Sequence, residues 1–109
     1  MSYAEELREH ARIAILRMLE DAPRYTSNVS IMTDLLPRFG ISYTRDQVVG
    51  ELAWLTEQGM LTTETLPGGF IVATATTRGC EVAQGIAVYP GIQRPRAANL
   101  HAFGPQDRP

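Results

Sequence analysis

The chain is poor in the residues from which metal, disulfide and catalytic sites are usually built. Its 109 residues include one cysteine, Cys80, and two histidines, His10 and His101. One thiol cannot form an internal disulfide, and so few soft ligands cannot complete a zinc site, which needs about four. No serine, cysteine or aspartate stands at a recognisable catalytic spacing from either histidine. We therefore expect no metal site, no cofactor and no enzyme activity.

Long apolar runs are also absent. No stretch approaches the roughly 20 apolar residues that a membrane helix needs, and the polar N-terminus MSYAEELREH is unlike a secretory signal. We expect a cytoplasmic protein without membrane contact. A chain of 109 residues with 44% hydrophobic content can bury one modest core, so a single domain is expected.

Positive charge is scarce for a protein that binds nucleic acid. Ten basic residues, all arginine, stand against twelve acidic ones, and the net charge is −2. Residues 82–109 hold three arginines and one acid, whereas residues 1–81 hold seven arginines and eleven acids. Attraction to phosphate would therefore have to come from local patches.

The clearest structural pattern lies in residues 44–61, TRDQVVGELAWLTEQGML. Thr44 and Gln47 have the spacing of a capping box, which predicts a helix that starts here. Gly59 can take the left-handed conformation that ends a helix. Between them, apolar residues recur at i, i+4 and i+7 and predict one buried stripe: Val48, Leu52 and Leu55.

A β-hairpin is expected directly after this helix. Residues 60–66 and 70–75 favour strands, and the Pro-Gly-Gly sequence at 67–69 is a strong turn signal. Residues 76–78 then begin a last short helix that runs to about residue 84.

Two further helices are expected upstream. The first spans residues 4–22 and stops before Pro23, which cannot continue it. The second ends at Gly40, and Pro37 should distort its last turn. Residues 41–43 form the short connection to the helix that starts at Thr44. The apolar residues of the second helix are Met32, Leu35, Leu36 and Phe39, at i, i+3, i+4 and i+7.

The first helix is apolar over much of its circumference, because Ile13 and Leu16 lie off the stripe that its other apolar residues form. Two explanations fit this pattern. Either the core wraps the helix on two sides, or Ile13 and Leu16 contribute to a homodimer interface.

Several segments together resemble a known family. They are SY at residues 2–3, ELAWLTEQG at 51–59 and TRG at 77–79. They are similar to small winged helix-turn-helix proteins of Mu-like phages and prophages, over residues 2–96. The spacing of Val48, Leu52, Leu55, Gly59 and Leu61 also resembles the recognition helix of ArsR and MarR regulators. The resemblance implies a mainly α fold with a small β-hairpin wing, a homodimer, and DNA binding in transcription regulation.

The outward residues of the capped helix are the candidates for contact with DNA. Arg45 can form two hydrogen bonds with guanine, and Gln47 with adenine if the capping box leaves it free. Gly50 lies on the same side. Tyr43 and Thr44 can bind phosphate at the helix N-terminus, where the helix dipole favours anions.

Two other residues of this helix are less suited to DNA. Glu51 is expected to project a negative charge from the same surface. An exposed Trp54 would be costly in water, so it either packs beneath the hairpin or anchors a partner protein.

The composition changes after residue 86. Four prolines and two glycines predict that residues 87–109 form a tail with no core of its own, after a domain of residues 1–86. Arg94 and Arg96 lie in a stretch without acids. The tail is either solvated and flexible, or an arm that reaches a phosphate backbone or a partner.

Two functions from different classes are consistent with these patterns. The first is a dimeric regulator that places the helix of residues 44–58 in the major groove of double-stranded DNA. The second is a phage adaptor, in genome packaging or host takeover, that binds another phage or host protein without sequence-specific DNA binding. The candidate residues for the partner are Ile13, Leu16 and Trp54.

Overall fold

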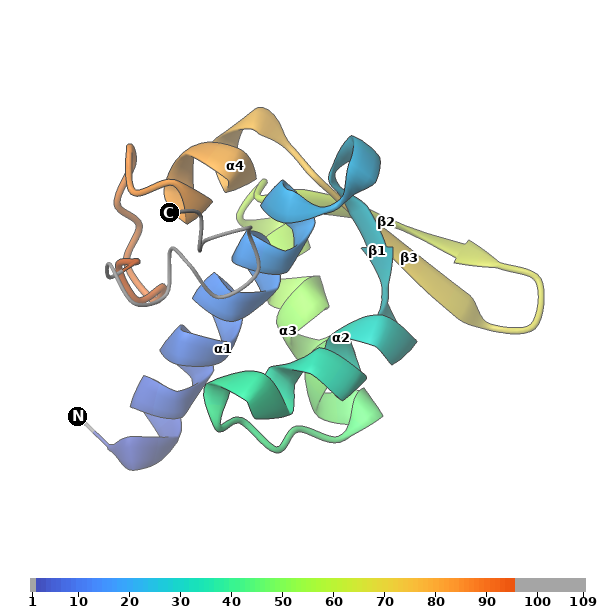
Figure 1. The fold of residues 1–109 in the computed structure, drawn as a ribbon, viewed down its shortest axis with the longest axis horizontal. Helices are drawn as coiled ribbons and strands as arrows, with labels where there is room; N and C mark the ends of the chain where they lie inside the picture. The colour runs from blue at the N-terminus through green and yellow to red at the C-terminus, as the bar shows by residue number, and fades with distance from the viewer. Residues whose placement is uncertain (1, 96–109) are drawn as a thin grey trace, which may run out of the picture.

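The computed structural model describes residues 2–95, and Figure 1 shows their arrangement. This part of the chain contains four α-helices, two 3-10 turns and a three-stranded antiparallel sheet, so the fold is mixed α and β. None of these helices is long and apolar enough to cross a membrane. The elements are α1 (Tyr3–Asp21), η1 (Pro23–Tyr25), β1 (Thr26–Asn28), α2 (Val29–Leu35), η2 (Leu36–Phe39), α3 (Arg45–Glu57), β2 (Leu61–Leu66), β3 (Phe70–Ala75) and α4 (Thr77–Ala83).

Helix α3 begins and ends where the sequence predicts. The Thr44 hydroxyl accepts a hydrogen bond from the Gln47 N–H at 3.2 Å, and the Gln47 side chain accepts one from the Thr44 N–H at 2.8 Å. This capping box satisfies two backbone donors that the first helical turn leaves without partners. At the other end Gly59 has a φ of 77° and turns the chain toward β2.

Helix α2 is short because Pro37 follows it closely. The Asn28 side chain caps its start by accepting the Ile31 N–H at 2.9 Å. After Leu35 the chain continues as the 3-10 turn η2, which contains Pro37 and ends at Gly40 with a φ of 76°. The predicted distortion of the last turn is confirmed. Its physical cause is that proline lacks the N–H needed for the α-helical bond and crowds the preceding turn.

The sheet places β3 between β1 and β2, with both pairs antiparallel. In the hairpin, Leu61 lies opposite Ala75 and Leu66 opposite Phe70. Figure 1 shows the tip of this hairpin projecting away from the helices. The hairpin was predicted, but strand β1 was not. Its three residues carry polar side chains without an alternating pattern, and it is a strand because Ser27 pairs with Ala73 far along the chain.

Helix α1 is the centre of the core. Every residue from 13 to 19 is buried, and helix α4 packs closely against this part of α1. Gly79 of α4 lies between α1 and the start of β2, because a Cβ at this position would stand 3.3 Å from the Leu16 side chain and would collide with the Met60 carbonyl oxygen. Ile13 and Leu16 are 2% and 0% exposed within a single chain. The apolar character of α1 therefore reflects a core that covers it on two sides, and neither residue is available to a partner.

Part of the segment from residue 87 to residue 93 packs against the helices. Ile92 belongs to the core, and the Gln93 N–H donates to the Glu9 carbonyl at 3.2 Å. The Gly91 carbonyl accepts a hydrogen bond from Arg12 at 2.9 Å. This arrangement differs from the prediction of a tail from residue 87 onward. Residues 96–109 of that predicted tail lie outside the described residues.

Candidate nucleic-acid interface

Helix α3 has a buried side and an exposed side. The predicted stripe of Val48, Leu52 and Leu55 is buried, which is confirmed by exposures of 0–1%. Glu51 is buried on the same side. The exposed residues are Arg45, Asp46, Gln47, Gly50, Ala53, Thr56 and Glu57.

Arg45 connects the start of α3 to the tip of the hairpin. Its side chain is exposed, and its Nη2 donates a hydrogen bond to the Gly69 carbonyl at 3.1 Å. Gly68 and Gly69 form the tight turn with φ values of 86° and 78°, which glycine adopts without strain. One of the five N–H groups of the guanidinium is used in this bond, so the others can still bind a ligand.

Thr44 and Gln47 are exposed, but both are engaged in the capping box. Recognition of adenine by glutamine requires both its oxygen and its NH₂ group. The oxygen of Gln47 already accepts the Thr44 N–H. The capping box therefore does not leave Gln47 free to bind adenine. Binding adenine would break the hydrogen bonds that begin the helix.

Tyr43 is buried and faces the protein interior. Its hydroxyl donates to Glu51 Oε2 at 3.2 Å. Burial, together with the nearby Glu51 carboxylate, raises the pKa of Tyr43 to about 12. The prediction that Tyr43 binds phosphate is therefore wrong, since its hydroxyl is already used inside the molecule.

Glu51 was expected to project outward, and this is wrong as well. It is 6% exposed, and its Oε1 lies 2.7 Å from Arg12 Nε of helix α1. Position 51 falls one turn after Val48, so it shares the buried side of α3. A carboxylate can remain there because it has both a cationic partner and the Tyr43 hydroxyl.

Trp54 packs beneath residues 89–91 and not beneath the hairpin. The Arg12 guanidinium lies 3.9 Å from the centre of its ring, and Tyr89 meets it edge-on at 6.4 Å. A Cβ at Gly91 would lie 3.1 Å from the ring. Trp54 is half-buried by these contacts. The sequence signal that was missed is Arg12, one of two arginines within the apolar stretch of residues 11–19 in α1.

The remaining arginine candidates lie near the end of the described chain. Arg94 is exposed in the segment that follows Ile92. Arg96 lies outside the described residues, so its predicted contact with DNA is untested. Among the described residues no group of three His, Cys, Asp or Glu side chains is placed to hold a metal ion.

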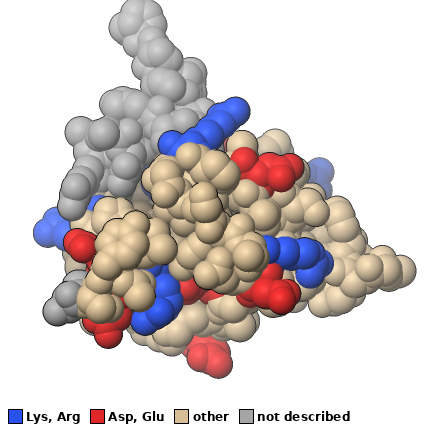
Figure 2. Space-filling model, turned by 90° about the horizontal axis from the view of Figure 1, so that it is seen from below, with Lys and Arg blue, Asp and Glu red and all other residues tan. Residues whose placement is uncertain are grey.

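Charges of opposite sign are interspersed on the surface. Figure 2 shows acidic and basic side chains beside one another, with no region of a single sign on that face. On α3 itself Arg45 is followed by Asp46, and Glu57 lies at the other end. The hairpin from Leu61 to Ala75 carries one charged residue, Glu64. Arg45 is therefore the main cationic group where α3 meets the hairpin.

Sequence comparison places the chain among phage proteins. It is 44% identical over 90 residues to "Uncharacterized protein gp26" of Escherichia phage Mu, covering 83% of this chain and 92% of that protein. It is 42% identical over 78 residues to an "Uncharacterized protein" of Haemophilus influenzae, covering 72% of this chain and 76% of that protein. The chain belongs to the family of phage Mu gp26. No protein-family model and no solved structure matches it.

Membership of the gp26 family confirms the predicted relation to Mu-like phages. Neither relative's name states an activity, so the function of this gp26 relative has to be argued from its own surface. That surface also has a groove, which is formed by elements other than α3.

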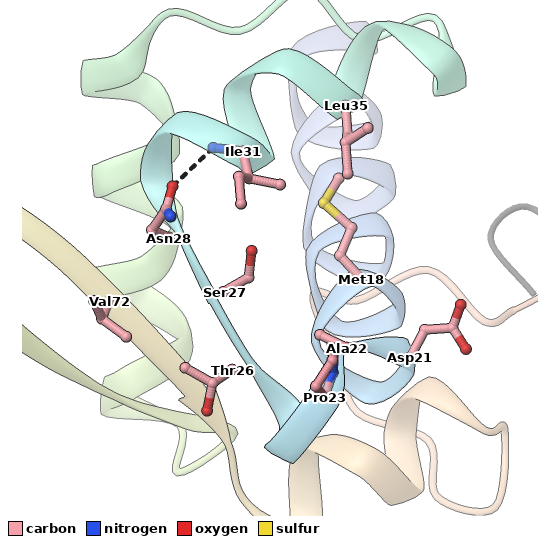
Figure 3. A pocket seen from close by; sticks show the side chains of 10 residues that line it. All are labelled: Met18, Asp21, Ala22, Pro23, Thr26, Ser27, Asn28, Ile31, Leu35 and Val72. Atoms are coloured by element: carbon pink, nitrogen blue, oxygen red, sulfur yellow. Dashed lines mark hydrogen bonds between the residues drawn. The ribbon is translucent and has the colours of Figure 1, made fainter.

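An apolar groove of about 570 Å³ lies between the end of α1, strand β1 and helix α2. Figure 3 shows Leu35 of α2 directly above Met18 of α1, with Ile31 pointing into the same space. Ile31 is 47% exposed and lies beside the stripe of α2 whose Met32 and Leu36 are buried. Sequence reasoning missed this groove because it forms only when three separate elements come together.

Proposed function

We propose that this member of the gp26 family is a winged helix-turn-helix protein that binds double-stranded DNA. Helix α3 would be the recognition helix and the β2–β3 hairpin the wing. The order α2, short turn, α3, hairpin is that of such domains. The observation that carries the proposal is the hydrogen bond from Arg45 to Gly69, because it joins the first turn of α3 to the hairpin tip. Helix and hairpin can then meet one duplex as a single surface.

The exposed side of α3 suits close approach to bases. Gly50 has no heavy atom within 4 Å of where its Cβ would stand, and Ala53 beside it is also exposed. Small residues let the helix backbone enter a major groove deeply, and the alanine methyl can contact a thymine methyl. Arg45 would read guanine or hold phosphate with its free N–H groups. Tyr43, Thr44 and Gln47 would contribute by fixing the helix start.

The scarcity of basic residues predicts a modest dependence on salt. Arg45 and Arg94 offer about two or three phosphate contacts, for which the affinity should fall by about 10 to 40-fold between 50 and 200 mM salt. Regulators that bind palindromic sites are dimers, and we include a homodimer in the proposal. Its interface would use a surface other than Ile13 and Leu16, and light scattering would measure its mass.

The test is fluorescence anisotropy with labelled DNA fragments from around the protein's own gene, at low and near-physiological salt. Arg45→Ala should weaken binding to the preferred fragment by about 5 to 150-fold, which corresponds to the loss of one bidentate base contact. Arg24→Asn is a matched control. It also removes one exposed positive charge, and asparagine tolerates the left-handed backbone of that residue, whose φ is 58°. Absence of binding to every fragment at low salt would contradict the proposal.

The groove of Figure 3 favours a second candidate function, an adaptor that binds another phage or host protein. Met18, Ile31, Leu35 and Val72 give its walls apolar surface beside the polar side chains of β1, and exposed apolar surface is typical of protein-binding sites. The partner surface would then be Met18, Ile31 and Leu35, in place of Ile13, Leu16 and Trp54. Ile31→Asp should abolish such a complex without affecting DNA binding, whereas Arg45→Ala should have the opposite pattern.

A further inference from the structure

A second, smaller groove lies on the side of the molecule that carries α4. Its volume is about 380 Å³, and it runs between η1, the end of β3 and α4. Two large side chains that line it are exposed, Tyr25 at 50% and Ile86 at 72%. Cys80 and Ala75 also line the groove. We propose that residues 96–109 of the same chain dock in this groove, with Leu100 and Phe103 as the side chains that fill it.

The position where the described chain ends supports this occupant. A Cβ at Gly85 would lie 3.3 Å from the ring of Pro95, so Pro95 sits against Gly85. The neighbours of Gly85 on both sides, Gln84 and Ile86, line the groove. The 14 residues that follow Pro95 therefore start beside it. Fully extended, they can span about 46 to 50 Å, which is ample to cross it.

The chemistry of the segment matches that of the groove. The sequence RAANLHAFGPQDRP contains three alanines besides Leu100 and Phe103, and two of its three charges are positive. The groove offers apolar surface together with the acidic side chain of Glu81. Glu20 is close by, since its Oε2 accepts a hydrogen bond from Gln84 at 3.1 Å. Arg96 and Arg108 can therefore find acidic partners while the apolar residues leave water.

The backbone of η1 holds one wall of the groove in place. Arg24 and Tyr25 both have positive φ, 58° and 57°, which is uncommon for residues other than glycine. Tyr25 lines the groove, and half of its side chain is exposed there. A segment docked there would cover Tyr25 and Ile86 together.

The single thiol of the chain makes the proposal testable. Cys80 lines the groove, so a docked segment should slow its reaction with a thiol reagent such as DTNB. In the full-length protein, Leu100→Asp/Phe103→Asp should raise the reaction rate about tenfold. The matched control Asn99→Asp/Gln106→Asp adds the same charge and keeps both apolar side chains, so it should react like the wild type. A chain that ends at Pro95 should react like the first variant.

Each outcome supports or overturns docking of residues 96–109 in this groove. Equal rates for the wild type and Leu100→Asp/Phe103→Asp overturn the proposal, provided that circular dichroism shows both to be folded. Protection that increases with protein concentration assigns the segment to a second copy, which also overturns docking within one chain. Rates in urea should be equal for all variants, which checks that the substitutions act through the folded state. The measurement does not involve DNA, so its result is independent of the function proposed above.

Discussion

The two sides of helix α3 differ in how their polar groups are used. On the buried side, Arg12 contacts Glu51, Gly91 and Trp54, and Tyr43 donates to the other oxygen of Glu51. On the exposed side, Arg45 makes one bond to the hairpin, and Gly50 and Ala53 offer no polar side chain. The paired polar groups of the buried side therefore position the helix, and the exposed side, which also carries Asp46 and Glu57, is what remains for recognition. Substitutions on the buried side should therefore change the stability of the protein, whereas substitutions on the exposed side should change DNA binding.

The largest effect is expected from removing the buried carboxylate. Glu51→Ala leaves the Arg12 guanidinium without its partner in a site where little water can enter. Breaking a buried pair in this way typically costs about 3–5 kcal/mol of unfolding free energy. Glu57→Ala is the control, because it removes the same side chain from the exposed side of the same helix and should change stability by less than about 0.5 kcal/mol. Urea unfolding measures the free energy of unfolding of both variants. Equal losses would mean that the carboxylate of Glu51 contributes no more to stability than the exposed one of Glu57.

A smaller effect is expected from titrating Tyr43. Its pKa is raised from 10.0 to about 12 in the folded protein, by burial and by the Glu51 carboxylate. The neutral phenol therefore stabilises the fold fully below pH 10, and this stabilisation is lost as the pH rises from about 10 to 12. The loss should be on the order of 2–3 kcal/mol.

Absorbance at 295 nm provides the measurement, since it follows tyrosine ionisation directly. Tyr43 should titrate in a late phase with a pKa of about 12, and Tyr43→Phe should remove that phase. Tyr25→Phe is the matched control, because Tyr25 is half exposed, and the late phase should remain. If Tyr43→Phe leaves the late phase in place, that phase does not come from Tyr43, and the raised pKa assigned to its buried hydroxyl is contradicted.

Local chemistry explains what the sequence could predict. The capping box at Thr44 and Gln47, the stops at Gly40 and Gly59 and the distortion at Pro37 depend on residues within four positions of one another. The apolar stripe of α3 depends on helical spacing alone. Each of these features was predicted, and each is present. The exposed position of Arg45 also follows from this spacing.

The features that were missed depend on contacts between distant residues. Glu51 is buried because Arg12, 39 positions earlier, supplies a partner. Trp54 is covered by residues 89–91, whose proline and glycine content predicted a tail without a core. Strand β1 exists because β3 pairs with it. Composition describes what a segment can do alone, and it does not reveal the surface against which that segment packs.

Two glycines, one at a packed position and one at an exposed position, provide the finest comparison. The same substitution to alanine should lower the free energy of unfolding at the first and raise it at the second. At Gly79 an added methyl group would meet the Met60 carbonyl and Leu16, so Gly79→Ala should cost about 1–3 kcal/mol through overpacking. At Gly50, in the middle of α3, the methyl group meets nothing within 4 Å. Because glycine is unfavourable inside a helix, Gly50→Ala should stabilise the protein by about 0.5–1 kcal/mol.

Thermal unfolding of the two variants beside the wild type distinguishes these effects, since the shifts in Tm should have opposite directions. The Gly50→Ala protein is then useful in the anisotropy experiment. Because it should be more stable than the wild type, any loss of DNA affinity cannot come from unfolding. An added methyl group on the exposed side of α3 should weaken binding to the preferred fragment, although the helix itself is more stable. Unchanged DNA affinity in this variant would show that the middle of α3 does not approach the bases. Any DNA contact would then have to come from Arg45 and the hairpin.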